Sequence, residues 1–306
     1  MKKLTILLIL LPVICLLVAG CGGETKLTGD FVNTGVKVSY SPAQGKTLHY
    51  RSDSDNLTEF TEKGYHQSTL SKTTNYQSFS VTDFKNDTTT LEYNFLFSET
   101  GIFQNGMYKK QEEEDELIGQ KLSITVGPEG NMIGWAGLED LEITDSGLDR
   151  GQLMASNYAS IYLNHFPTEP IKVGSKWKRT NTMEVTTEDG IISQNVIKSY
   201  VVEDFVSKDE HPCVKCRITI EIDNSGEGTA ENEGKHYNYY TEGKGQGNGT
   251  IYFDFENGYP VYSNFNWIVD FTITNVEVET QEEGSFTYYE EDNVTNTLVD
   301  ESEIPE

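Results

Sequence analysis

The side chains with the greatest capacity for chemistry in this sequence are five imidazoles and four thiols. The histidines are scattered, and no two of them have the spacing that would place both on one face of a helix or strand: His49, His66, His165, His211 and His236. No serine has the Gly-x-Ser-x-Gly context of a nucleophile elbow, and no glycine-rich loop has the strand-to-helix context of a phosphate site. The sequence therefore predicts a protein that is not an enzyme.

Two of the thiols, Cys213 and Cys216, have a spacing that invites a redox or metal interpretation. The segment from Cys213 to Ile222 nevertheless alternates as a strand does, with Cys216 among the apolar residues and Cys213 among the polar ones. Residues three apart on a strand lie about 10 Å apart, beyond the reach of a disulfide. We predict two free thiols, Cys216 buried and Cys213 on the polar face, and no metal site. A turn beginning at His211-Pro212 would instead allow a bridge.

Cys21 stands in a different context. Lys2 and Lys3 precede an apolar run, Leu4 to Val18, of about fifteen residues, which is shorter than the roughly twenty needed to span a bilayer. These parts are typical of an export signal. The residues Val18-Ala19-Gly20-Cys21 resemble the lipobox of bacterial lipoproteins. This resemblance implies cleavage before Cys21 and covalent attachment of a diacylglycerol and an N-acyl chain to it, with no other cofactor.

The expected lipid fixes the expected location. Two or three acyl chains make release from a bilayer negligible, so the anchor is permanent. Gly22 follows the cysteine, in place of the aspartate that retains some lipoproteins at an inner membrane. We expect an exported protein on the outer membrane if the cell has one, and otherwise on the outer face of the cell membrane.

The composition excludes some partners. Removal of Lys2 and Lys3 with the leader leaves 21 basic and 49 acidic side chains, a formal charge of 21 − 49 = −28. Nucleic acid and anionic head groups repel such a body over a Debye length of about 8 to 10 Å. The charge favours solubility or, alternatively, calcium or a cationic partner. The segment Asp53-Ser54-Asp55-Asn56 begins as a calcium loop does but lacks the glycine and distal glutamate, which favours a turn or strand edge.

Hydrophobic residues recur with a period of two along most of the chain, which predicts a mainly β fold with ten to twelve strands in long, curved antiparallel sheets. The apolar members of three runs illustrate this: Leu91, Tyr93, Phe95 and Phe97; Leu122, Ile124 and Val126; Val261, Phe265, Trp267, Val269, Phe271 and Ile273. Between Ile273 and Val276 the phase slips by one residue, which predicts a bulge.

One amphipathic helix is predicted over 145–166, with Asp145 as its cap and Pro167 as its stop. No residue in 151–164 is charged, although 24% of the chain is. We therefore expect this helix to pack on the concave face of a sheet. Four of its side chains are the predicted ligand-binding residues: Met154, Tyr158, Ile161 and Tyr162.

An internal repeat is predicted from two pairs of similar segments. Gly45-Lys46-Thr47-Leu48 resembles Gly174-Ser175-Lys176-Trp177, and Val81-Thr82-Asp83-Phe84 resembles Val202-Glu203-Asp204-Phe205. The resulting organisation is a signal peptide (1–20), a tether (21–35), a first β half (36–144), the connecting helix (145–166), a second β half (167–298) and an acidic tail (299–306).

The residues Val173-Gly174-Ser175-Lys176-Trp177, after Phe166-Pro167-Thr168-Glu169-Pro170, resemble a family of bacterial lipoproteins of unknown function over about 40–275. That family offers no catalytic or binding residue to transfer. The layout is also similar to that of periplasmic lipoprotein carriers and lipid-binding half-barrels, a likeness of architecture alone.

These observations predict a membrane-anchored, non-enzymatic binding module for an apolar or lipid ligand, which Met154, Tyr158, Ile161 and Tyr162 would line. The alternative is an envelope scaffold lipoprotein that presents its acidic face to another protein and has no ligand cavity.

Overall fold

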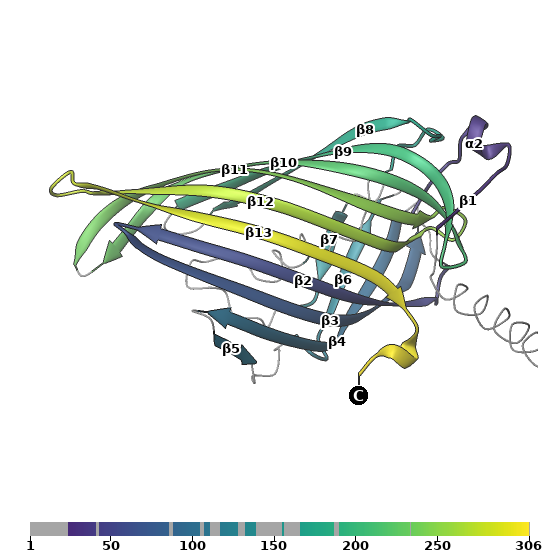
Figure 1. The fold of residues 1–306 in the computed structure, drawn as a ribbon, viewed down its shortest axis with the longest axis horizontal. Coiled ribbons are helices and arrows are strands. Elements are labelled where there is room, and N and C mark those ends of the chain that lie inside the picture. The colour runs from purple at the N-terminus through teal and green to yellow at the C-terminus, as the bar shows by residue number, and fades with distance from the viewer. Residues whose placement is uncertain are drawn as a thin grey trace, which may run out of the picture.

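A computed structural model describes residues 24–40, 43–85, 88–104, 107–110, 117–127, 132–138, 155, 166–186, 190–232 and 234–305. The described chain forms one antiparallel sheet of 13 strands (Figure 1). The strands are β1 (Thr25–Lys26), β2 (Thr47–Glu62), β3 (Tyr65–Lys85), β4 (Thr88–Gln104), β5 (Met107–Lys110), β6 (Lys121–Val126), β7 (Met132–Ala136), β8 (Lys176–Thr186), β9 (Gly190–Lys208), β10 (His211–Asn232), β11 (Lys235–Asp254), β12 (Tyr259–Glu277) and β13 (Glu283–Val299).

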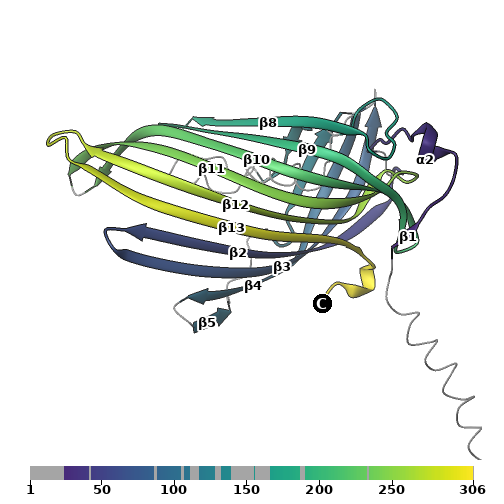
Figure 2. The ribbon, with the colours of Figure 1, turned by 45° about the horizontal axis from the view of Figure 1, so that its top comes forward.

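The sheet is long and strongly curved, as both views of the ribbon show (Figures 1 and 2). Its main path runs in the order β1-β9-β10-β11-β12-β13-β2-β3-β4-β6-β7, while β5 pairs with β4 and β8 pairs with β9. The mainly β prediction is confirmed, but ten to twelve strands is too few. The difference comes from elements such as β1 and β5, whose two and four residues are too short to show a hydrophobic period.

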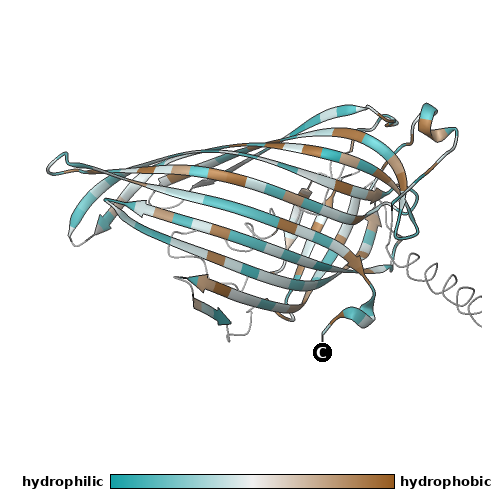
Figure 3. Ribbon diagram, viewed as in Figure 1, coloured by the Kyte–Doolittle hydropathy of each residue, from teal (hydrophilic) through white to brown (hydrophobic). Residues whose placement is uncertain are grey.

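Alternation of apolar and polar residues fixes which side of each strand is buried, and it is visible as alternating bands along the ribbon (Figure 3). Leu122, Ile124 and Val126 of β6 are all completely buried, as predicted. In β4 the alternation ends at a register shift after Phe95, so that Phe97 lies opposite Tyr76 rather than with the core residues.

The bulge predicted between Ile273 and Val276 is absent, because β12 keeps one register there with both β11 and β13. The slip in hydrophobic phase instead reflects the end of the buried part of β12, where Ile273 and Val276 are only partly buried.

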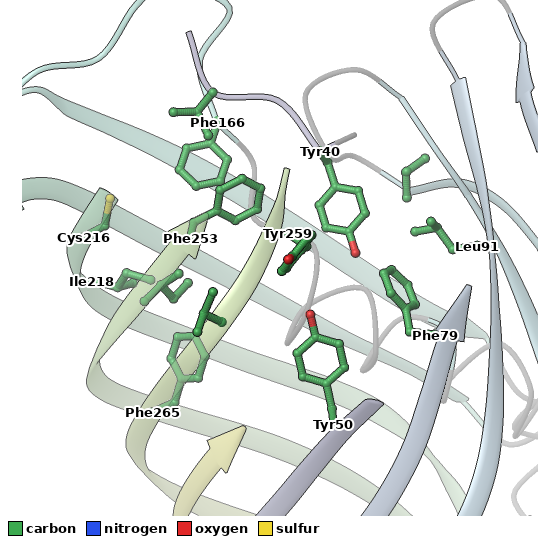
Figure 4. Packing of buried hydrophobic residues seen from close by; sticks show 14 of the residues in the cluster. Tyr40, Tyr50, Phe79, Leu91, Phe166, Cys216, Ile218, Phe253, Tyr259 and Phe265 are labelled. Carbon is green, nitrogen blue, oxygen red and sulfur yellow. The ribbon is translucent and has the colours of Figure 1, made fainter. Parts of the chain in front are cut away.

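The core lies inside the curve, toward one end of the sheet. There, aromatic side chains from strands distant in sequence project toward one another (Figure 4). The ring centroids of Phe79 and Tyr93 lie 4.8 Å apart, and those of Phe166 and Phe253 lie 4.7 Å apart. The Tyr50 hydroxyl donates to the Pro260 carbonyl at 2.7 Å, which satisfies its polar end within the core.

The chain just after the predicted lipidation site is attached to the body. β1 pairs with β9, and the carboxylate of Glu24 accepts hydrogen bonds from Lys215 at 3.0 Å and from the Tyr252 hydroxyl at 2.6 Å. The short helix α2 (Phe31–Thr34) follows, and the Phe31 ring contacts that of Phe205 with centroids 5.5 Å apart. Much of the segment 24–35 therefore packs on the sheet.

The segments that suggested a repeat make matching contacts in the two halves. The Gly45 N–H donates to the Val81 carbonyl at 3.1 Å, and the Gly174 N–H donates to the Val202 carbonyl at 2.9 Å. Both glycines have positive φ angles, 80° and 83°, which a residue with a side chain rarely adopts. Each therefore makes a turn that starts a long strand.

The predicted helix over 145–166 lies outside the described residues except for Ala155 and Phe166. In the described part of the chain, only α2, a 3₁₀ turn (Glu301–Glu303) and the single residue Ala155 are helical. No helical element is thus described on the concave face of the sheet. Within the same residues, no helix is long and apolar enough to span a bilayer.

Cys213 and Cys216 are free thiols, which confirms the absence of a bridge between them. Both are buried, so the prediction that Cys213 is exposed on the polar face is wrong. Cys213 lies opposite Val206 and Asp254, which are buried too, so this end of the convex face is closed to solvent. Burial raises the pKa of both thiols, which makes them poor nucleophiles.

Candidate functional site

None of the residues predicted to carry function lies in the described part of the chain. Cys21 precedes it, and the four proposed ligand-binding residues fall within 139–165, where only Ala155 is described: Met154, Tyr158, Ile161 and Tyr162. Ala155 and Phe166 are both buried in the hydrophobic core. The candidate site must therefore be built from the concave face of the sheet itself.

One wall of the concave face is apolar. Strands β10 and β12 point large apolar side chains toward the inside of the curve, and β11 between them has glycine at every second position. The facing residues are Ile218, Ile220 and Ile222 of β10, Gly243, Gly245, Gly247 and Gly249 of β11, and Phe265, Trp267, Val269 and Phe271 of β12. Most of these side chains are buried, whereas Trp267 and Phe271 are half-buried.

The glycines of this wall make room for the side chains of β12. A Cβ on Gly249 would lie 2.5 Å from a ring carbon of Phe265, and one on Gly243 would lie 2.5 Å from a ring carbon of Phe271. Both distances are far below van der Waals contact. The two aromatic rings therefore lie across β11, where only glycine leaves the space that they fill.

The neighbouring wall, formed by β13 and β2, carries a polar cluster in its middle part. Asn56 of β2 donates one hydrogen bond to Asp292 at 2.7 Å and another to Glu290 at 3.2 Å, both on β13. Strand pairing places Asp292 opposite Trp267 and Glu290 opposite Val269. The carboxyl pair thus lies directly beside the apolar wall, and the concave face is amphipathic.

Burial and the charge of Asp292 raise the pKa of Glu290 to about 7. On β9, opposite Ile220 at the border of the apolar wall, burial lowers the pKa of Lys198 to about 8, and its ammonium lies 5.8 Å from the centre of the Phe265 ring. An amine with a lowered pKa and a carboxyl with a raised pKa therefore lie on the same face of the sheet. The arrangement can place a polar head group beside an apolar surface.

We expect Glu290→Gln to stabilise the protein by about 1–2 kcal/mol at pH 8, a value reduced for solvent screening because Glu290 is partly exposed. The folded-state pKa is raised, so the contribution of Glu290 to stability is present below pH 4.5 and lost as the pH rises through about 7. The gain from Glu290→Gln should therefore vanish near pH 4. Urea unfolding at pH 8 and pH 4 measures the change in the free energy of unfolding. Glu221→Gln is the control, because Glu221 is exposed.

An equal gain at both pH values would show that the charge of Glu290 is not responsible.

The other sequence candidates have structural partners. His211 Nδ1 lies 2.9 Å from the buried carboxylate of Asp254. Asp53 and Asp55, which suggested a calcium loop, lie on strand β2 and form ion pairs with Arg51 at 2.9 Å and Lys72 at 2.7 Å. Across the described ranges, no three histidine, cysteine, aspartate or glutamate residues are grouped so as to hold a metal ion.

Sequence reasoning missed the carboxyl pair. Glu290 and Asp292 are two apart on a strand, a spacing that places both on one face and could have been noticed. Asn56, which bridges them, comes from the other end of the chain, and nothing local to it indicates the contact.

No family model matches the chain, and no curated protein matches it. Among solved structures it is similar to OccK11 (OpdR) of Pseudomonas aeruginosa, with 4% identity, 85% of this chain and 98% of that chain covered, and a TM-score of 0.19. It is also similar to a mutant porin of Rh. blastica, with 7% identity, coverages of 83% and 100%, and a TM-score of 0.22. TM-scores this low support no inference about fold or function.

The resemblance to a family of lipoproteins and to lipoprotein carriers is wrong, because no family model matches the chain. The segment Val173–Trp177 that suggested it contains the turn at Gly174 and the start of β8. Similar residues at Gly45 make the same kind of turn before β2. The shared turn geometry accounts for the similarity of the two segments.

Proposed function

We propose that this protein is an exported lipoprotein, anchored through acyl chains on Cys21, that binds an apolar or lipid ligand on the concave face of its sheet without catalysing a reaction. The observation that carries the proposal is the amphipathic concave face. There an apolar wall, with Trp267 and Phe271 half-buried, borders the polar cluster of Asn56, Glu290 and Asp292.

The chemistry of the two walls fits an amphiphile. The half-buried rings of Trp267 and Phe271 on β12 offer contact to an acyl chain, which gains about 25 cal/mol for each Å² removed from water. The amide and carboxyl groups of β13 and β2 lie next to them, where they can hydrogen-bond a head group. An apolar chain and a polar head would thus be held by adjacent strands.

The position of Glu24 supports a body held close to the membrane. Glu24 is fixed by Lys215 and Tyr252, and only Gly22 and Gly23 separate it from Cys21. Three residues of extended chain span at most about 11 Å. If Cys21 carries the lipid, the sheet lies near the bilayer surface, and a membrane-derived ligand has a short path to it.

Binding of a fluorescent fatty acid to the purified protein tests the ligand. We expect saturable binding that Phe271→Ser weakens at least fivefold, because it removes a half-buried ring from the apolar wall. Thr272→Ser is the matched control, since Thr272 is the next residue and is exposed on the convex face. Absence of binding, together with no co-purifying lipid by mass spectrometry, would refute the ligand.

Labelled palmitate tests the anchor separately. We expect the label on the wild-type chain and its complete loss in Cys21→Ser, which removes the acceptor thiol. Cys15→Ser, within the leader, should keep the label. Labelling that survives Cys21→Ser would refute this anchor and leave ligand binding to be judged on its own.

The alternative function is an envelope interaction lipoprotein. It is favoured by the convex face, where exposed polar residues such as Asn264, Asp270 and Asn293 alternate with the buried ones. Crosslinking in intact cells that captures one dominant neighbour on this face would favour it over ligand binding.

A further inference from the structure

The two halves of the chain begin with equivalent strands. Leu48, the second residue of β2, lies opposite Phe79 of β3, and Trp177, the second residue of β8, lies opposite Tyr200 of β9. Phe79 and Tyr200 are both buried. By register, β8 therefore occupies in the second half the place that β2 occupies in the first.

The equivalence extends into the next strand of each half. Thr82 of β3 and Glu203 of β9 are each skipped by the register of the following strand, which makes a bulge at matching positions. Immediately after each bulge, Asp83 and Asp204 accept the N–H of the following phenylalanine, both at 2.9 Å. Agreement at this level of detail is not expected of unrelated strand pairs.

The equivalent strands differ in one respect, the state of their outer edge. The edge of β2 that faces away from β3 is paired with β13, from His49 to Thr61. No described strand pairs with the corresponding edge of β8, which forms the border of the sheet (Figure 2). An unpaired edge presents backbone donors and acceptors that another strand can join.

We propose that the edge of β8 is an interaction surface for a second copy of this chain, whose own β8 adds to it antiparallel about a two-fold axis at Asn181. The basic residues of β8 lie in its first four positions and its one acidic residue, Glu184, lies two residues before its end, so antiparallel pairing is complementary in charge. With Asn181 on the axis, Lys178 of each copy lies opposite Glu184 of the other. Both side chains are exposed, and neither makes an ion pair with a described residue.

The other arrangements are less favourable. A parallel pairing of two β8 strands would place Lys178 against Lys178, and like charges directly opposite are destabilising. The opposite border of the sheet, β7, offers only five residues, fewer than half the eleven of β8. A closed two-fold pair also leaves no free β8 edge on which a filament could grow.

Disulfide trapping in membranes of cells that express the full-length chain tests the proposal. Across the two-fold axis the Cα atoms of residue 181 would lie about 4.5–5.5 Å apart, within disulfide range. We expect Asn181→Cys to give a dimer band on non-reducing gels after mild oxidation. Thr272→Cys, exposed on β12 between two paired strands, should give none.

Charge reversal in the Asn181→Cys background makes the test specific for this register. Lys178→Glu should reduce the trapped dimer at least fivefold, and adding Glu184→Lys should restore it. Protease resistance of each variant checks folding. A dimer yield no higher than that of Thr272→Cys, a yield indifferent to Lys178→Glu, or a crosslink to a protein of another mass would overturn the proposal.

Discussion

Replacing Gly247 with valine is expected to lower the free energy of unfolding by about 3 kcal/mol or more, and Gly247→Ala by about 2 kcal/mol. A Cβ at this position would lie 2.5 Å from the carbonyl oxygen of Asn266 and 2.7 Å from the Cβ of Trp267. The obstacle is the backbone of β12 rather than a flexible side chain. The strands must therefore separate, which weakens both the sheet and the apolar wall.

Urea unfolding followed by tryptophan fluorescence measures the loss. Gly134→Ala is the matched control, since Gly134 also lies within a strand, β7, but a Cβ there would meet nothing within 4 Å. Alanine is preferred over glycine in a strand, so this variant should be neutral or slightly more stable. Equal stability of Gly247→Ala and Gly134→Ala would show that β12 does not approach β11 so closely.

Asp254→Ala is expected to lower the free energy of unfolding by about 3–5 kcal/mol. The carboxylate is completely buried and accepts the N–H groups of Glu256 at 3.0 Å and Asn257 at 2.8 Å. It also accepts from the Asn257 side chain at 2.8 Å and lies 2.9 Å from His211. Alanine would leave the turn between β11 and β12 without the buried acceptor that holds its N–H groups.

Two further variants separate this effect from simple loss of a charge. Asp254→Asn retains one acceptor oxygen and should lose about half as much stability. Asp270→Ala removes a carboxylate from the exposed face of β12 and should change stability by less than about 0.5 kcal/mol. Thermal unfolding of the three variants ranks them by their loss of stability. A midpoint for Asp254→Ala equal to that of Asp270→Ala would contradict the structural role of this group.

The local alternation of apolar and polar residues was sufficient to predict the strands but not which strands pair with one another. The alternation of Leu122, Ile124 and Val126 shows directly which side of β6 is buried, because side chains on a strand point to opposite faces in turn. It failed at Phe97, where a register shift with β3 moves the side chain off the core face. Such a shift depends on the partner strand, which the local sequence does not specify.

The state of each face also depends on distant segments. Alternation placed Cys213 on the side of its strand shared with Lys215, but Val206 and Asp254 beside it are buried, so that side is closed there. In the candidate site, too, part of the geometry follows from the local sequence and part depends on a distant strand. Glu290 and Asp292 could be paired from their spacing, whereas Asn56 joins them only because β13 lies next to β2.

The pairing of β13 with β2 has a consequence for how the protein folds. Val299 lies opposite His49, so contacts that complete the middle of the sheet join residues 299 − 49 = 250 positions apart, and such non-local contacts slow folding. A chain synthesised or threaded through a channel from its N-terminus presents β2 long before β13 exists to join it. During that interval the bare border of β2 is open to mispairing and aggregation. Folding is thus completed only when the C-terminal strand arrives, and truncated chains that lack it would be substrates for quality control rather than smaller working proteins.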